Sequence, residues 1–408
     1  IAAPGARQRS VKNYFGLILL LEFFMVGVFT ATDVFLFYVF FEAMLVPMYF
    51  IIGSFGGPRR QYAAMKFFLY SLVGGLLMLA SVIGLYVTTG SRSFAITDLI
   101  GHVPDGATQK WLFLGFFIAF AIKAPLVPFH TWLPDAGAEA PAGGAALLVG
   151  VLDKVGTFGM IRFCLQLFPE ASKWATPVVL VLAVISILYG ALLAIGQTDI
   201  MRLIAYTSVS HFGFIVLGIF ALTTTGGAGS TLYMLNHGFS TAALFLIGAM
   251  LVARRGSKRI PDFGGWQRVT PGLAGVFLVA GLSGLALPGL SSFVSEFLVL
   301  VGTFQRYKAV AIISTAGIVL AALYILLMYK RMMTGPRPDL EAAGERVLDI
   351  TLREKLVVAP LIAAFLVLGF YPKPVLDVLN PAVATTLKYV GVSDPAPAVP
   401  TTADGSAK

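Results

Sequence analysis

Long apolar runs are the feature that most constrains how this chain can fold. Runs of about 18 or more mostly apolar residues recur along nearly the whole sequence, and each is long enough to cross a hydrocarbon core of roughly 30 Å as a helix. Hydrophobic residues make up 58% of the 408 residues and charged residues only 12%. This composition excludes a water-soluble globular domain and predicts an all-α, polytopic transmembrane bundle.

We predict eleven membrane spans. Two of them are interrupted, the fourth by Pro125 and Pro128 and the ninth by glycines and a proline between Gly281 and Gly289, and such breaks free backbone groups that need other partners. The predicted spans cover residues 14–31, 33–54, 62–88, 111–132, 143–166, 175–195, 200–222, 230–253, 271–302, 308–330 and 354–371.

The interrupted spans lie five helices apart, which indicates two inverted five-helix repeats, each with one broken helix, and one extra C-terminal helix. Broken helices at matching repeat positions are typical of transporters, where they mark the ion path. The resulting division is a cytoplasmic segment 1–13 with upstream helices missing, repeats 14–166 and 175–330, a cytoplasmic loop 331–353, an extra span 354–371, and an outside-facing tail 372–408 that is partly disordered from Val392 onward.

Basic residues are concentrated in the loops on one side of the predicted membrane. If the spans alternate, the loops on the N-terminal side contain Arg59, Arg60, Arg254 and Arg255, whereas the opposite loops contain only scattered Lys and Arg. The positive-inside rule therefore places the N-terminal side in the cytoplasm. Because the chain begins at Ile1 and not at methionine, we expect further residues upstream.

Ionisable side chains inside the predicted spans are the strongest functional signal. Each costs roughly 2.5 to 3.5 kcal/mol at the centre of a helix, so it must be paired, hydrated or used. These residues are Glu22, Glu42, Lys66, Lys123, Asp153, Lys154, His211, His237 and Glu296.

Glu42 and Lys123 are the predicted switch of a proton path. Glu42 lies in a very apolar span and needs a cation, and Lys123 lies just before the break at Pro125, where water and side chains can meet. A neighbouring carboxylate stabilises a lysine ammonium, so moving or neutralising one partner can release or capture a proton.

The other candidates extend this pair into an axis. Lys154 follows Asp153 in the fifth span, His211 and His237 lie in the seventh and eighth, and histidine suits a proton relay. Glu296 follows the second break as Lys123 accompanies the first. We therefore predict a line of proton-handling groups from Glu42 through Lys123, Lys154 and His237 to Glu296.

Structural roles remain open for several of these groups. Any single Lys–Glu pair could be a clamp between helices, and His211 could equally serve packing. Glu22 and Lys66 are predicted to snorkel towards an interface or to join neighbouring helices. For His130 and Asp135, at the end of the fourth span, we predict helix ending and capping.

The sequence contains no recognisable motif for a metal, nucleotide or redox cofactor. The four histidines are dispersed, the single Cys164 has no partner cysteine, and there is no Walker loop or Rossmann glycine fingerprint. We therefore expect no cofactor in this chain, and energy must come from an ion gradient or from a partner protein.

Five segments resemble one known family closely. The strings FYVFFEAMLVPMYFIIG, IKAPLVPFHTWLPDAGAEAPAGGAALL, LDKVGTFGMIRF, RLIAYTSVSHFGFIVLG and LNHGFSTAALFLIGAMLV resemble the antiporter-like subunits shared by respiratory complex I and the multisubunit sodium/proton antiporters. Glu296 stands where most members of this family carry lysine, and it favours the M-type branch of the complex I members.

The resemblance implies specific roles for the candidate residues. Glu42 matches the essential glutamate of the first half-channel, Lys123 its lysine partner, Lys154 the lysine that leads towards the centre, His237 the histidine of the central axis, and Glu296 the proton-handling residue of the second half-channel; His211 matches a position of less certain role. Asp153 departs from the leucine expected there and leaves the charge state of Lys154 in doubt.

The resemblance also implies a setting. Members of the family have fourteen helices, lie in the bacterial inner membrane, and assemble with L-type and N-type neighbours, the L-type sending a lateral helix along this subunit's flank. NADH, FMN, iron–sulfur clusters and quinone are expected in other subunits of the complex. Two alternatives remain: a sodium/proton antiporter component without a redox partner, and a structural spacer with an inactive channel.

Overall fold

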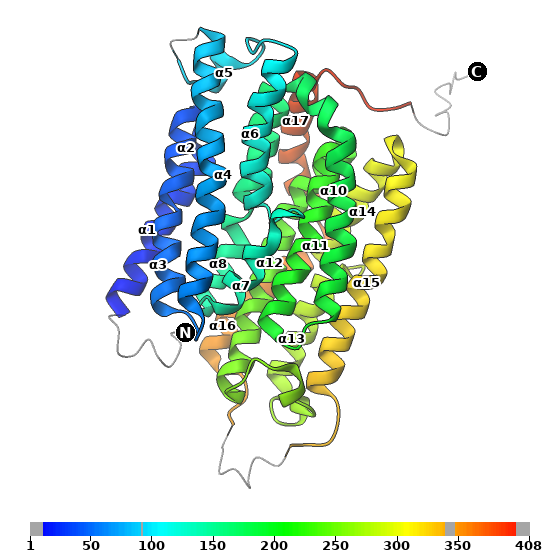
Figure 1. Ribbon diagram of the computed structural model, residues 1–408. Helices are drawn as coiled ribbons and strands as arrows, with labels where there is room; N and C mark the ends of the chain where they lie inside the picture. The colour runs from blue at the N-terminus through cyan, green and yellow to red at the C-terminus, as the bar shows by residue number, and fades with distance from the viewer. Residues whose placement is uncertain (1–10, 91–92, 339–346, 397–408) are drawn as a thin grey trace, which may run out of the picture.

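The computed structural model describes residues 11–90, 93–338 and 347–396. Within these ranges the chain is helical and contains no β-strand, only isolated bridges joining Asp33 to Ala95 and Asp199 to Arg259. Figure 1 shows the helices running along one long axis, with α1 to α4 on one side, α15 on the other, and α11 and α12 between them. The polytopic all-α prediction is confirmed.

The helices follow the apolar runs of the sequence closely. They are α1 (Val11–Thr30), α2 (Val34–Ala43), α3 (Leu45–Phe55), α4 (Arg60–Thr89), α5 (Ile96–Leu99), α6 (Ala107–Lys123), α7 (Trp132–Glu139), α8 (Ala142–Leu147), α9 (Lys154–Gly159), α10 (Pro169–Ile195), α11 (Ile200–Phe220), α12 (Thr224–Arg255), α13 (Pro271–Gly284), α14 (Ser291–Arg306), α15 (Lys308–Met333), α16 (Leu352–Phe370) and α17 (Lys373–Val390), with short η segments between some of them.

Eight helical segments of the described chain are long and apolar enough to cross a membrane, or up to nine if the bent pair α16 and α17 forms one span. The predicted fourth and ninth spans fall short because each is broken. The fourth comprises α6, a 3₁₀ turn at Phe129–Thr131 and α7, and the ninth comprises α13 and α14. No unbroken piece of either reaches the length needed to cross a bilayer.

The first break is stabilised by side chains from other segments. After α6 ends at Lys123, the indole nitrogen of Trp132 donates to the carbonyl of Ile122 at 2.8 Å. The backbone amide of Val127 donates to the Ser186 hydroxyl of α10 at 2.9 Å. Irregular backbone survives in a bilayer only where its polar groups find such partners inside the protein.

Helix α11 lies at the centre of the bundle, and 94% of its apolar 18-residue stretch is buried inside the protein. It packs against α10 and α12, and the residues buried along it surround almost its whole circumference. A helix that is apolar and buried on all sides belongs in the interior of a bundle. Polar side chains on α11 and α12 are therefore shielded from lipid by the surrounding helices.

Part of the tail predicted for residues 372–408 is helical. Residues Lys373–Val390 form α17, which is bent by 71° from α16. Its buried residues Val383, Thr386, Leu387 and Val390 recur at helical spacing and form one face, and α17 packs against α12. Residues 397–408 of the tail lie outside the described part of the chain, as do residues 1–10 and 339–346 of the predicted N-terminal segment and loop.

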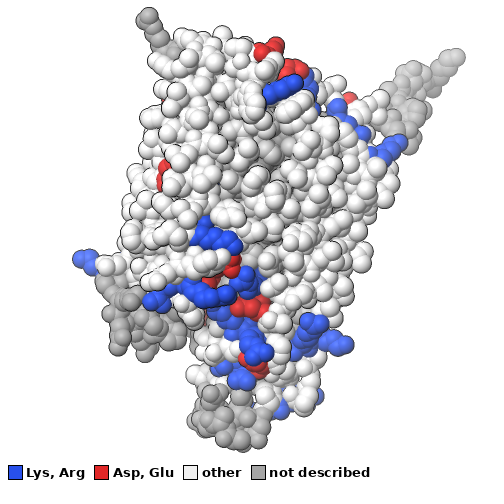
Figure 2. All heavy atoms as spheres, in the orientation of Figure 1, with Lys and Arg blue, Asp and Glu red and all other residues white. Residues whose placement is uncertain are grey.

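Lys and Arg side chains gather towards one end of the bundle. Figure 2 shows this concentration on the lower part of the face in view, the same end at which α12 and α15 end in Figure 1. The upper part of this face is mostly uncharged. The asymmetry is of the kind that the positive-inside rule uses to assign orientation.

A polar clamp holds the beginning of the second broken helix at this end. The Asp349 carboxylate accepts from the backbone amides of Gly272 (2.7 Å) and Leu273 (2.9 Å), in the first turn of α13. Arg254, at the end of α12, donates to both carboxylate oxygens of Glu354 (3.0 and 2.7 Å) and to the carbonyl of Asp349. The clamp thus joins α12, α13 and α16.

The Asp349 carboxylate is stabilised in its charged form. Partial burial by itself raises its pKa, but the amides of Gly272, Ile350 and Leu273 and the charge of Arg254 outweigh that effect, so the pKa lies below its ordinary value. A group whose pKa is depressed by folding contributes stability above its unfolded pKa and loses that contribution as the pH falls through its folded pKa.

We predict that Asp349→Ala lowers the stability of the detergent-solubilised protein at neutral pH by about 1 kcal/mol, the usual cost of a lost helix cap. Thermal unfolding measured over a pH series should show the difference from wild type shrinking below about pH 4, near the ordinary pKa of aspartate. Asp98→Ala, at an exposed position in α5, is the control. Equal melting temperatures for Asp349→Ala and wild type at pH 7 would contradict the clamp.

Candidate functional site

Glu42 lies near the end of α2, just before the chain continues into α3 at Leu45. One oxygen of its carboxylate, Oε1, is buried without a hydrogen-bond partner. The carboxylate lies directly against Gly75 of α4, where a Cβ atom would overlap with Oε1. The glycine therefore provides the space that this carboxylate occupies.

Lys123 is the last residue of α6 and is fully buried. Its ammonium makes no hydrogen bond and lies over the rings of Phe41 and Phe67, at 5.2 and 5.3 Å from their centroids. Such contacts offset part of the cost of burying a cation. Lys123 thus stands at the first break in a largely aromatic environment.

Glu42 and Lys123 are not a direct pair. In the described part of the chain no ion pair within 4.0 Å joins them, although each charge acts electrostatically on the other. The two groups lie in one neighbourhood, and their role as the switch of a proton path stays a prediction.

Lys154 and His237 are brought into contact although 83 residues separate them. The Lys154 ammonium donates to Nδ1 of His237 at 2.8 Å and also to the backbone carbonyl of Val149. It lies 5.1 Å from the centroid of the Phe212 ring. Lys154 begins α9 directly after a π-helical segment, Leu148–Leu152, and such segments often accompany functional sites because they re-aim side chains.

The chain of polar groups continues from His237 to His211. Their ring centroids are 5.1 Å apart, and Nε2 of His211 is hydrogen-bonded to the Tyr324 hydroxyl at 3.1 Å. Among the described residues Nε2 of His237 has no hydrogen-bond partner, so it can accept or donate a proton through a water molecule.

Glu296 lies in α14, directly after the second break, and is buried. The tyrosines Tyr233 and Tyr324 both interact electrostatically with it. Since Tyr324 also bonds His211, this tyrosine connects the histidines to Glu296. The Asn236 amide donates to the Ser291 carbonyl at 2.7 Å and to the Ser295 hydroxyl at 3.2 Å, which fixes α12 against the start of α14.

The two tyrosines were missed by the sequence reasoning. Tyr233 and Tyr324 are fully buried, and a phenol that is buried in a bilayer normally needs a polar partner. That expectation is the signal that could have found them. Their partners could not be identified from the sequence, because α12, α14 and α15 meet only in the folded chain.

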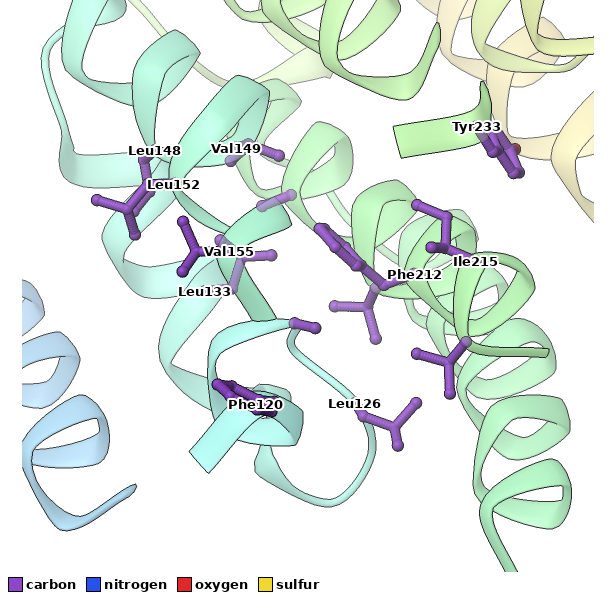
Figure 3. Close-up of a cluster of buried hydrophobic side chains, with 14 of the residues drawn as sticks. Phe120, Leu126, Leu133, Leu148, Val149, Leu152, Val155, Phe212, Ile215 and Tyr233 are labelled. Atoms are coloured by element: carbon purple, nitrogen blue, oxygen red, sulfur yellow. The ribbon is translucent and has the colours of Figure 1, made fainter. Parts of the chain in front are cut away.

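An apolar shell surrounds the polar groups. Figure 3 shows Leu152 and Val155 from the segment around Lys154, and Phe212 from α11, among the buried side chains of this region. In surroundings of low polarity, the interaction between charges is stronger than in water. A change of charge at one group therefore affects its neighbours strongly.

Asp135 is part of an ion cluster, which corrects the prediction of a capping role. Its carboxylate accepts from the Lys66 ammonium at 2.7 Å and from the Arg202 guanidinium at 2.8 Å. The cluster joins α4, α7 and α11 below the first break. Lys66 accordingly has the helix-joining role that was one of its predicted alternatives, whereas Glu22 is exposed on α1. His130 is buried with its ring 5.6 Å from Tyr189.

Among the described residues, no group of three or more His, Cys, Asp or Glu side chains could hold a metal ion. The arrangement instead consists of carboxylates, lysines, histidines and tyrosines that can each exchange a proton. From Lys154 to Tyr324 the successive groups are within contact distance, so protons could pass along them with the help of a few water molecules.

Comparisons with known proteins give a consistent result. Residues 31–323 match the family described as NADH:quinone oxidoreductase/Mrp antiporter, TM. The chain is 56% identical over 408 residues to NADH-quinone oxidoreductase subunit M of Mycobacterium tuberculosis strain H37Rv, an alignment that covers 98% of this chain and 73% of that protein. The protein of the same name from Rhodobacter capsulatus is 42% identical over 395 residues, with 94% and 77% coverage.

Solved structures show the same fold. A chain of respiratory complex I from Thermus thermophilus superposes with a TM-score of 0.87 at 36% identity and covers 93% of this chain and 80% of that one. A chain of the Mrp complex from Dietzia sp. gives a TM-score of 0.83 at 22% identity, over 92% and 79% of the two chains, which is a likeness of fold alone.

We predict that Gly75→Ala destabilises the protein by about 1 to 3 kcal/mol, because the added methyl group must displace the Glu42 carboxylate or the helix that carries it. Thermal unfolding in detergent measures the effect. Gly16→Ala in α1 is a matched control, since a methyl group there meets no other atom within 4 Å.

The double variant Gly75→Ala/Glu42→Ala isolates the cause. If the carboxylate is what the methyl group strikes, the double variant should be more stable than the sum of the two single effects predicts, as coupled neighbours are. Additive effects would contradict this close contact.

Proposed function

Because the chain belongs to the NADH:quinone oxidoreductase/Mrp antiporter transmembrane family, we propose that it is a proton-translocating membrane-arm subunit of an NADH:quinone oxidoreductase. Protons pass through two half-channels that a buried axis of Glu, Lys and His side chains joins. The axis contains Glu42, Lys123, Lys154, His237 and Glu296, with His211 beside His237. Quinone reduction in other subunits drives the transfer.

The observation that carries this proposal is the hydrogen bond between Lys154 and His237. An ammonium that donates to an imidazole nitrogen can pass it a proton, which leaves a neutral amine and an imidazolium. His211, 5.1 Å away, and Tyr324 continue the sequence of exchangeable groups towards Glu296. Lysine and histidine side chains carry a free-energy cost in a bilayer interior, so their presence there favours such a use.

The first half-channel contains Glu42 and Lys123, and their separation is part of the proposed mechanism. Lys123 stands at the end of a helix whose next residues are not helical, so its position is not fixed by a continuous backbone. When the ammonium approaches Glu42 it is stabilised, and when it withdraws it releases its proton towards the centre. The cation–π contacts with Phe41 and Phe67 hold the withdrawn position.

The two half-channels are proposed to be the two inverted repeats, residues 14–166 and 175–330. The support is the equivalent placement of the two breaks, α6 to α7 with Lys123 and α13 to α14 with Glu296. The end of the bundle that carries most Lys and Arg faces the cytoplasm in this proposal, in accord with the positive-inside rule.

The energy source and the partners follow from the family. The relatives named above are subunits of NADH-quinone oxidoreductase, and the solved structures are multisubunit membrane complexes. In this proposal NADH, FMN, iron–sulfur clusters and quinone are bound by other subunits, because the sequence carries no motif for them. The neighbours are L-type and N-type subunits, and the apolar lipid-facing helices lie in the bacterial inner membrane.

A component of a sodium/proton antiporter complex is the alternative function, and the fold shared with the Mrp complex supports it. Copurification separates the two. Flavin and iron–sulfur subunits should accompany this chain if it works in an NADH:quinone oxidoreductase, and they should be absent if it belongs to an antiporter.

We predict that Glu42→Ala and Lys123→Ala each abolish most NADH-driven proton translocation, because each removes one partner of the switch in the first half-channel. Translocation is measured by quenching of a pH-sensitive dye in inverted membrane vesicles, and assembly of the complex by native electrophoresis. Glu170→Ala, at an exposed position in the first turn of α10, is the control. Full translocation by both variants would show that the channel is inactive and that this subunit is a spacer.

A further inference from the structure

Asp153 is a buried carboxylate that the path described above does not use. Its side chain is 0% exposed, and neither carboxylate oxygen has a hydrogen-bond partner in the described part of the chain. An ionised carboxylate without partners is very costly in an apolar interior. The group must therefore take up a proton, bind water, or respond to nearby cations.

The surroundings of Asp153 place it between the two lysines of the path. It immediately precedes Lys154 at the junction of the π-helical segment Leu148–Leu152 and α9. On the other side is the end of α6, because a Cβ atom at Gly156 would stand 2.6 Å from the carbonyl oxygen of Phe120 and 2.7 Å from the amide of Ala124. The start of α9 is thus packed against the last turn of α6, which ends at Lys123.

Electrostatic interactions agree with this placement. Asp153 interacts with both Lys154 and Lys123. The titratable groups that act on this carboxylate are Lys123 on α6 and Lys154 on α9.

Lys154 also borders an open groove of about 420 Å³ that is lined mainly by apolar side chains, among them Phe29 of α1 and Leu235 of α12. A proton leaving Asp153 therefore reaches a lysine whose ammonium is hydrogen-bonded to His237.

We propose that Asp153 is a proton-carrying group between Lys123 and Lys154, so that protons cross from the first half-channel to the centre through a carboxylate. The inference rests on the proposed function. In the first step the Lys123 ammonium loses a proton and the Asp153 carboxylate gains it, so that an N–H bond breaks and an O–H bond forms. In the second step the Asp153 carboxyl loses that proton to the neutral amine of Lys154, which restores the carboxylate and forms an ammonium.

Asp153 explains how two lysines can exchange a proton although each would repel the other when both are charged. The carboxylate is negative when a lysine beside it is positive, and it is neutral while it carries the proton, so the net charge of the three groups stays constant through both steps. Without it, the region would hold two buried ammonium groups with no carboxylate between them.

Three variants of the assembled complex in inverted membrane vesicles test the proposal. Asp153→Asn keeps the shape of the side chain but cannot exchange a proton, and we expect NADH-driven translocation to fall about 100-fold, at the low end of the usual effect of removing an acid–base group. Asp153→Glu restores a carboxyl and should recover most of the rate. Asp98→Asn, at an exposed position in α5, is the matched control. Native electrophoresis checks that each variant assembles.

Infrared difference spectroscopy distinguishes a proton carrier from a fixed counter-charge. Addition of NADH should produce a carboxylic acid C=O band in wild type that is missing in Asp153→Asn and shifted in Asp153→Glu. A wild-type rate in Asp153→Asn, or a spectrum that Asp153→Asn leaves unchanged, would overturn the proposal. If Asp153→Asn and Lys123→Ala both pump at the wild-type rate, the proposed function itself fails. If Lys123→Ala is defective but Asp153→Asn pumps at the wild-type rate, only the role of Asp153 is overturned.

Discussion

The cost of placing charge inside a bilayer is the constraint on which the rest of this structure depends. A lysine, carboxylate or histidine at membrane depth persists only with partners, water or a task, and the fold supplies these by breaking its helices. α6 ends at Lys123 and α14 begins shortly before Glu296, while a π-helical segment precedes Asp153 and Lys154. Irregular backbone and buried charge therefore occur together, and both are enclosed by α10, α11, α12 and the other apolar helices.

The buried charged groups differ in how many partners they have, and this difference distinguishes structural groups from proton-transfer groups. Lys66 and Arg202 both pair with Asp135 in an ion cluster, as expected of a clamp. The side chains of Lys123 and Asp153 have no hydrogen-bond partner in the part of the chain that the structure describes, whereas Lys154 donates to His237, which can itself accept a proton. Charged groups that are paired hold helices together. Charged groups without partners, in surroundings of low polarity, respond to any movement of a neighbour, which is what a proton-transfer path needs.

The sequence predicted much of this arrangement, and the errors have physical reasons. The apolar runs located the spans and the prolines located the first break, because both depend on local chemistry. Helix α17 was not predicted, because only its packing against α12 reveals the buried face of Val383 and Leu387. The Asp135 cluster, the contact of Lys154 with His237 and the bond of His211 with Tyr324 join residues from different helices, and no spacing in one sequence encodes such contacts. The distance between Glu42 and Lys123 was not predictable for the same reason, because opposite charge in two different spans does not fix a distance.

The central claim is that one continuous buried axis carries protons between the two halves of this subunit, and the step from Lys154 to His237 is its middle. The most direct measurement is the number of protons moved per NADH oxidised in vesicles that contain the His237→Ala variant in a fully assembled complex. The account predicts that this ratio falls while NADH oxidation continues, since the path is cut without touching a redox group. A ratio equal to that of the wild type would contradict it.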